Sequence, residues 1–132
     1  MNILDGTKKL SGKIVKGEQI GRTIGFPTAN INYLGDEKFE FGVYGVIVKV
    51  LNKEFRGVLN IGKRPTIDDG DKVSYEVNIC KFDCDIYGEE LECELIFFVR
   101  AEKKFENVDK LKAQIQKDIF EVREKFDLES WE

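Results

Sequence analysis

The stretch that decides the fold is GVYGVIVKVLNKEFRGVLNI, residues 42–61. Every second residue of 44–50 is apolar, which is the period of a strand with one face in a core. The pair Asn52-Lys53 separates this run from a second apolar run at 55–61, so the two runs are predicted to form a hairpin. Glycine and proline within 62–66 are predicted to end the second strand.

Outward from this hairpin, similar alternation recurs in short segments separated by turn residues. Further strands are predicted at 10–17, 31–34, 73–82 and 91–99. From 108 to 126 apolar residues recur at steps of three and four, which predicts an amphipathic helix with Asn107 as its N-cap. This order favours a mainly β fold, a small closed antiparallel barrel with a long C-terminal α-helix that could cover one opening.

Composition bounds the class of protein. The 132 residues, 42% of them hydrophobic, suit a single domain over 1–132, with a lead-in at 1–9 and a tail at 127–132. No apolar run approaches the roughly 20 residues of a membrane-spanning helix, and no signal peptide is visible. A net charge of −4 argues against a nucleic-acid partner. The odd cysteine count, 3, indicates inert thiols in a reducing cytoplasm. Since no exposed apolar face is evident, we expect a monomer.

The loop GRTIGFPTAN, residues 21–30, has the composition of a phosphate and metal site. Its candidate ligand-binding residues are Gly21, Arg22, Gly25, Pro27, Thr28, Ala29 and Asn30. Glycines let backbone N–H groups form a concave anion site, and an arginine adds a positive fork for phosphate. The oxygens of Thr28 and Asn30 are the kind that Mg²⁺ takes. An ordinary glycine-rich turn before a strand has the same composition, so both interpretations stay open here.

Histidine is absent, so any general base must be a carboxylate, lysine, tyrosine or cysteine. Glu76 is the candidate, since it lies mid-strand on the polar face of 73–82, although such faces usually meet water. Asn60 opens a second glycine-and-base turn that could contact a ligand or simply end a strand. Arg123 lies off the apolar stripe of the helix and could reach a ligand or serve as surface charge.

These residues occur in segments that resemble the riboflavin kinase family, including the kinase module of bifunctional bacterial FAD synthetases. The resemblance runs from about Leu10 to Phe126, and Pro-Thr-Ala-Asn at 27–30 is its most specific motif. The other matching segments are 12–17, 42–44, 60–66, 75–77, 86–88 and 100–105, with Phe82 and the helix pairs 114–115 and 118–119.

The resemblance implies a compact Greek-key barrel that transfers the γ-phosphoryl group of ATP to the ribityl 5′-hydroxyl of riboflavin, giving FMN and ADP. It implies that Thr28 and Asn30 ligate Mg²⁺ and touch the phosphates, and that Gly21, Arg22 and Gly25 shape the ATP loop. Glu76 is implied to be the general base, and the joint at 100–105 and the helix would border the flavin.

Two further expectations concern activity. The adenylyltransferase module of the bifunctional synthetases carries a His-x-Gly-His signature, and this chain has no histidine, so FMN adenylyltransferase activity is not expected. The alternative to a kinase is a non-catalytic flavin- or nucleotide-binding module on the same barrel, which would bind these ligands without turnover. A small barrel used only for protein contacts leaves the loop at 21–30 without a purpose.

Overall fold

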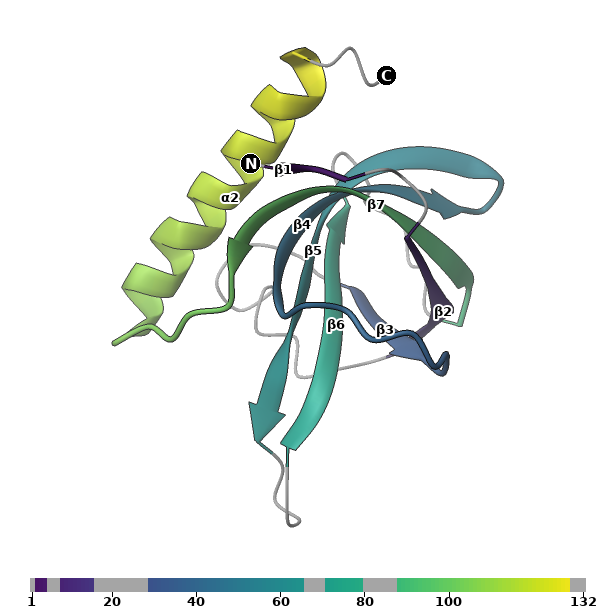
Figure 1. Cartoon of the computed structure of the whole chain (residues 1–132), viewed down its shortest axis with the longest axis horizontal. Coiled ribbons are helices and arrows are strands. Elements are labelled where there is room, and N and C mark those ends of the chain that lie inside the picture. The colour runs from purple at the N-terminus through teal and green to yellow at the C-terminus, as the bar shows by residue number, and fades with distance from the viewer. Residues whose placement is uncertain (1, 5–7, 16–28, 66–70, 80–87, 129–132) are drawn as a thin grey trace.

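The computed structural model describes residues 2–4, 8–15, 29–65, 71–79 and 88–128 (Figure 1). Its elements are β1 (Asn2–Ile3), β2 (Lys9–Val15), β3 (Ala29–Tyr33), β4 (Gly42–Val50), β5 (Lys53–Pro65), β6 (Asp71–Ile79), β7 (Glu90–Ala101) and α2 (Val108–Leu128). Within the predicted lead-in, β1 pairs with β7 at Phe97 and Phe98. The helix continues to Leu128, inside the predicted tail.

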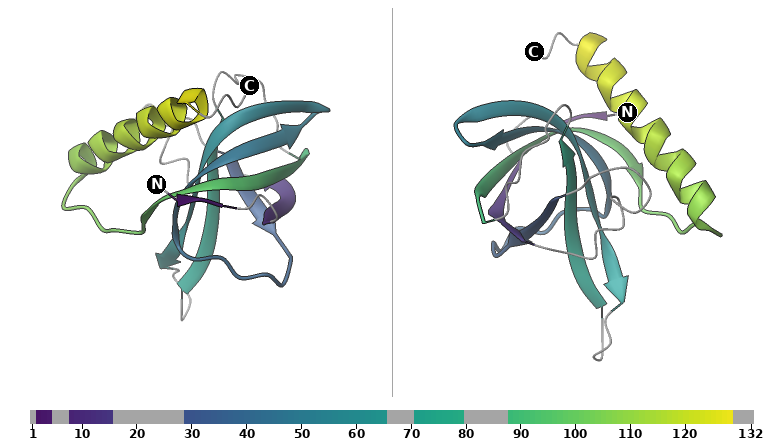
Figure 2. Two further views of the ribbon diagram at one scale, coloured as in Figure 1. Left: turned by 45° about the horizontal axis from the view of Figure 1, so that its top comes forward. Right: turned by 180° about the vertical axis from the view of Figure 1, so that it is seen from behind.

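Six of these strands close into an antiparallel barrel. The order is β7-β2-β3-β6-β5-β4, and pairing of β4 with β7 completes the circle. The consecutive strands β4, β5 and β6 form a meander, and β7 returns beside β4, which is Greek-key connectivity. Closure pairs each barrel strand on both sides over part of its length, as the views in Figures 1 and 2 show. The predicted fold class is therefore confirmed.

Alternate side chains of the wall divide the core into two clusters. Tyr44, Val46 and Val48 point inward with Leu59 and other buried residues of the interior cluster. Val43, Ile47 and Val58 point outward, where they pack against α2 in a cluster that also holds these helix and β7 residues: Ile96, Phe97, Val122 and Phe126. The helix therefore packs on the outer wall of the barrel, and the expectation that it covers an opening is wrong (Figure 2).

The β4–β5 hairpin differs from the prediction at its turn and at the end of β5. Its turn residues are Leu51 and Asn52, with φ of 54° and 61°, because Val50 pairs directly with Lys53. Two positive φ values are the geometry of the two-residue turn whose twist suits a hairpin. Strand β5 also continues through Gly62 to Pro65, since β6 pairs with it along that length. Cross-strand pairing outweighs the local breaker signal of glycine and proline.

Helix α2 begins as predicted. The side-chain oxygen of Asn107 accepts a hydrogen bond from the Lys110 backbone N–H at 2.9 Å, so the N-cap is confirmed. Asp109 lies in the first turn, where negative charge suits the helix dipole. No helix in the described part of the chain combines the length and the apolar character needed to cross a membrane.

Candidate active site

One register row of the sheet brings together three predicted site residues. Asn30 on β3 pairs directly with Glu76 on β6, and Glu76 pairs directly with Asn60 on β5. We call Asn30, Glu76 and Asn60 the polar row. Directly paired residues of antiparallel strands project to the same face with Cβ atoms about 5 Å apart. The amide, the carboxylate and the second amide are therefore neighbours on one surface.

The polar row lies on the outer wall. Asn60 pairs with Val43, which projects outward into the α2 cluster, so the row shares that outward face. Glu76 and Asn30 are half-buried and Asn60 is exposed. Backbone pairing on both sides of Glu76 places this residue on a rigid part of the barrel.

The remaining predicted site residues either lie outside the polar row or lie outside the residues that the structure describes. Ala29 pairs with Val77 and its side chain belongs to the interior cluster, so it contributes no side-chain group to the outer wall. Arg123 is exposed on α2, next to the buried Val122. Five predicted residues lie outside the described residues: Gly21, Arg22, Gly25, Pro27 and Thr28.

Two tyrosines and one cysteine, which are other candidate bases, have raised pKa values in the structure. Burial, followed by the charge of Glu40, raises the pKa of Tyr44 to about 12, and its hydroxyl donates to the Glu40 carbonyl at 2.5 Å. Burial, followed by Tyr33, also raises the pKa of Tyr75. Burial raises the pKa of the Cys93 thiol, in line with the predicted inert cysteine. Because these three groups stay protonated near neutral pH, a carboxylate is a better base than any of them.

Sequence reasoning left out a buried ion pair at the end of the same row. Arg100 pairs with Val43, and its guanidinium donates to the Asp118 carboxylate through Nε at 3.0 Å and Nη2 at 2.8 Å. Gln114 donates to the same carboxylate at 2.9 Å, and Asp118 is only 3% exposed. An acid within the apolar stripe of a helix is the sequence signal for such a buried partner. The pair holds α2 to β7.

A second contact from the same segment reaches β5. Glu102 Oε2 accepts a hydrogen bond from the backbone N–H of Lys63 at 2.9 Å. Gly62, the preceding residue, pairs with Ser74, which lies two residues before Glu76 on β6. Arg100 and Glu102 both belong to the segment 100–105, which resembles the riboflavin kinase family and in which the resemblance implies no role for either side chain alone.

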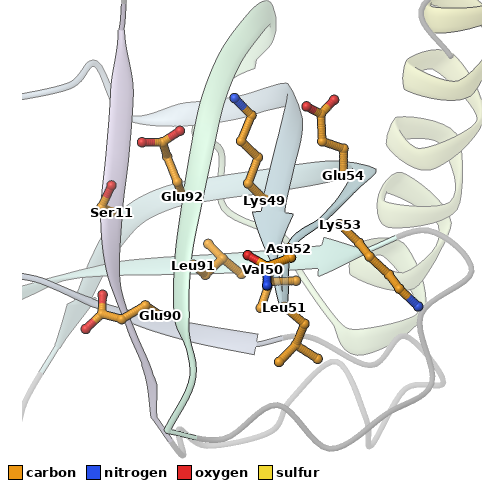
Figure 3. Close-up of a pocket in the computed structure, with 10 residues that line it drawn as sticks. All are labelled: Ser11, Lys49, Val50, Leu51, Asn52, Lys53, Glu54, Glu90, Leu91 and Glu92. Atoms are coloured by element: carbon orange, nitrogen blue, oxygen red, sulfur yellow. The ribbon is translucent and has the colours of Figure 1, made fainter.

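An open depression of about 560 Å³ lies elsewhere on the molecule (Figure 3). It is lined by the β4–β5 turn and by charged residues of β4, β5 and β7. Lys49, in this lining, is six residues along β4 from Val43, about 20 Å at the rise of a strand. The depression is therefore separate from the polar row.

The oxygen donors of the polar row bear on metal binding. Among the described residues, no three His, Cys, Asp or Glu side chains gather where they could hold a metal ion. Asn30 and Glu76 nevertheless place an amide oxygen and a carboxylate side by side, and oxygen donors of this kind suit Mg²⁺ with a nucleotide's phosphates. The oxygen donors of these two residues fit such an ion.

Comparison with known proteins identifies the family of this chain. The riboflavin kinase (flavokinase) family model matches residues 4–126. The chain belongs to the riboflavin kinase family. Within that family, it is 41% identical over 122 residues to an RNA-binding riboflavin kinase of Bacillus subtilis, covering 90% of this chain and 51% of that protein. It is 43% identical over 119 residues to a bifunctional riboflavin kinase/FMN adenylyltransferase of Haemophilus influenzae, covering 89% and 38%.

Solved structures show the same barrel. A Streptococcus pneumoniae structure titled as a macrolide-efflux protein aligns with a TM-score of 0.79 and 37% identity, over 87% of this chain and 38% of that one. Riboflavin kinase from Trypanosoma brucei aligns with a TM-score of 0.64 and 20% identity, over 96% and 82%, and shows the fold. This member of the riboflavin kinase family spans about half or less of the curated relatives' length.

Proposed function

We propose that this chain is a riboflavin kinase, which transfers the γ-phosphoryl group of ATP to the ribityl 5′-hydroxyl of riboflavin and yields FMN and ADP. The observation that carries the proposal is the polar row, in which Glu76 lies in register between Asn30 and Asn60. Family membership supplies the substrates, and the row supplies a base and a neighbouring ligand where phosphoryl transfer needs them. We expect no FMN adenylyltransferase activity from this chain, and we place the reaction in the cytoplasm.

In the proposed reaction Glu76 accepts a hydrogen bond, and then the proton, from the 5′-hydroxyl as its oxygen attacks the γ-phosphorus. The bond from that phosphorus to the β,γ-bridging oxygen breaks, and ADP leaves. Such a base contributes about 10²- to 10⁴-fold to the rate. Most of the remaining work is in-line positioning, for which strands paired on both sides are a rigid support.

The metal belongs to the nucleotide side of the site. We propose that Asn30 and Thr28 hold Mg²⁺, which when bound supplies positive charge against the phosphate oxygens. Gly21, Arg22, Gly25 and Pro27 are proposed to shape the loop around the ATP phosphates. Asn60 borders the base from β5, and Arg123 is proposed to reach the bound ligand from α2.

The deciding experiment is an assay of FMN formation from riboflavin by purified protein with Mg²⁺, read by chromatography. We expect FMN and ADP in equal amounts with ATP, and a parallel reaction with CTP measures donor preference. Removal of Mg²⁺ by a chelator should stop the reaction. Absence of FMN under all these conditions would contradict the proposal. Binding of riboflavin or ATP without turnover would identify the non-catalytic module instead.

A further inference from the structure

The end of β5 lacks a strand neighbour on one side within the described residues. Strand β4 begins at Gly42, opposite Ile61, and β7 ends at Ala101, opposite the same Gly42. Beyond Ile61, β5 pairs with β6 alone, and Figure 1 shows the two strands projecting together from the barrel. The backbone N–H of Lys63 lies in this projecting part and donates to Glu102. A side chain thus takes the hydrogen bond that a third strand would otherwise accept.

The shape of the backbone at Gly62 fits this contact. A Cβ on Gly62 would collide with Glu102 Oε2, and its next neighbour outside Glu102 would be Asn60 Oδ1 at 3.8 Å. The missing side chain therefore leaves room for the carboxylate beside the amide of the polar row. Gly62 needs no left-handed φ, so an alanine there would act through this collision and not through backbone strain.

The contact between Glu102 and Lys63 also lies close to the proposed base, because β5 pairs with the strand that carries Glu76. Gly62 pairs with Ser74, whose hydroxyl donates to the Gly62 carbonyl at 3.5 Å. Ser74 and Glu76 are two residues apart on β6 and project to the same face. A shift of β5 at Gly62 would therefore move Ser74 of β6, which is only two residues from Glu76.

We propose that Glu102 is a positioning residue for the phosphoryl transfer, because its carboxylate holds β5 at Lys63 and thereby aligns Glu76 and Asn60. This inference rests on the proposed kinase function. Glu102 acts through Lys63 and Gly62 and needs no contact with substrate. A displacement of about 1 Å in such a site can cost 10²-fold in rate, so a modest shift of β5 has a measurable effect.

The test compares Glu102→Ala, Glu102→Gln and Gly62→Ala in the full chain. Glu102→Ala should lower kcat by about 10-fold and change KM for riboflavin by less than about 3-fold, as expected for misalignment without lost substrate contacts. Gly62→Ala should give the same loss, since it expels the carboxylate, and the double variant should lose no more than either single one. Glu102→Gln keeps an oxygen acceptor and should retain activity within about 2-fold.

A matched control is Glu106→Ala, which removes an exposed glutamate four residues after Glu102 that pairs with Lys110 at 3.2 Å. It should leave kcat unchanged. Amide exchange of Lys63, followed by NMR, gives a second readout and should accelerate by about 10-fold in Glu102→Ala. The positioning role would be overturned if the kcat losses of Glu102→Ala and Gly62→Ala multiplied in the double variant. An inactive Glu102→Gln would also overturn it. A faster Glu102→Ala enzyme would overturn it as well, because the carboxylate would then be competing with a ligand.

Failure of the inference can be told apart from failure of the kinase proposal. If wild-type protein forms FMN and Glu102→Ala is equally fast, the kinase function stands and the inference is wrong. If wild-type protein forms no FMN, the kinase function is wrong. Lys63 amide exchange still decides the contact in that case, and an exchange rate unchanged by Glu102→Ala overturns it.

Discussion

Two register rows cross the same outer wall and differ in how their charges are arranged. The polar row places Glu76 between the neutral amides of Asn30 and Asn60. The charged row, near the depression of Figure 3, runs through these residues: Ser11, Glu92, Lys49 and Glu54. There a lysine lies directly between two glutamates. Both rows rest on the same barrel, so backbone geometry alone does not distinguish them.

The difference lies in what each row leaves for a ligand. Opposite charges directly across strands stabilise a sheet by roughly 0.2–1 kcal/mol per pair, so the charged row suits a structural role on a solvated surface. In the polar row the register neighbours of the carboxylate are neutral amides, and we propose that its negative charge acts on a substrate proton or a metal. The arrangement of neighbours, and not the presence of a cavity, separates the candidate site from ordinary surface.

The largest expected effect is the loss of activity in Glu76→Gln. This change keeps size and hydrogen bonding but removes the proton acceptor, so kcat should fall by about 10²- to 10⁴-fold. The matched control is Glu92→Gln in the charged row, which should retain activity within about 2-fold. Steady-state FMN formation measures both, and circular dichroism checks the fold. Equal kcat values for the two variants would remove the distinction between the rows.

The next effect is on stability and concerns the ion pair at the end of the polar row. Arg100→Ala leaves the Asp118 carboxylate, 3% exposed, without its cation. The free energy of unfolding should fall by about 3 kcal/mol, the low end for a broken buried pair because Arg100 is partly exposed. Lys49→Ala, which removes the exposed cation of the charged row, should change it by less than about 0.5 kcal/mol. Urea denaturation measures both, and a loss for Arg100→Ala no larger than that for Lys49→Ala would be contrary to this prediction.

Asn30→Ala tests the nucleotide side of the polar row. Loss of a side chain that supports a metal site typically costs 10- to 100-fold, so the KM for ATP with Mg²⁺ should rise by about 10-fold. Asn32→Ala is a close control, since Asn32 lies two residues along β3 and pairs with Lys13. It should leave that KM unchanged. Kinetics at several Mg²⁺ concentrations show whether the metal is involved, and identical KM values for the two variants would exclude Asn30 from the site.

The smallest effect is at the turn beside the charged row, where we expect the sequence to serve the fold alone. Leu51 has φ of 54°, a conformation that costs an ordinary residue about 1 kcal/mol and that asparagine tolerates better. Leu51→Asn should therefore raise the free energy of unfolding by about 0.5 kcal/mol without changing kcat. Leu34→Asn is the control, since Leu34 is exposed at 82% without a positive φ. Thermal unfolding measures the gain, and lost activity in Leu51→Asn would link this end of the barrel to function.

Much of the fold and part of the site could be predicted from local patterns. The two-residue period located strands in every region where the structure has the barrel, and the change to steps of three and four located α2 and its cap at Asn107. Glu76 was a candidate from its place on a polar strand face, and the family resemblance supplied its proposed role as a base. Turn residues and the end of β5 were predicted less well, because pairing with β6 carries that strand past Gly62 to Pro65.

What the sequence determined by itself is which residues alternate, which face of each strand is apolar, and which side chains are candidates for the site. Only the tertiary structure decided that Asn30, Asn60 and Glu76 share one row, that α2 lies on the outer wall, and that Glu102 reaches Lys63. The physical reason is that alternation is a property of a few adjacent residues. Strand register and side-chain contacts between distant segments depend on how the closed barrel pairs the whole chain.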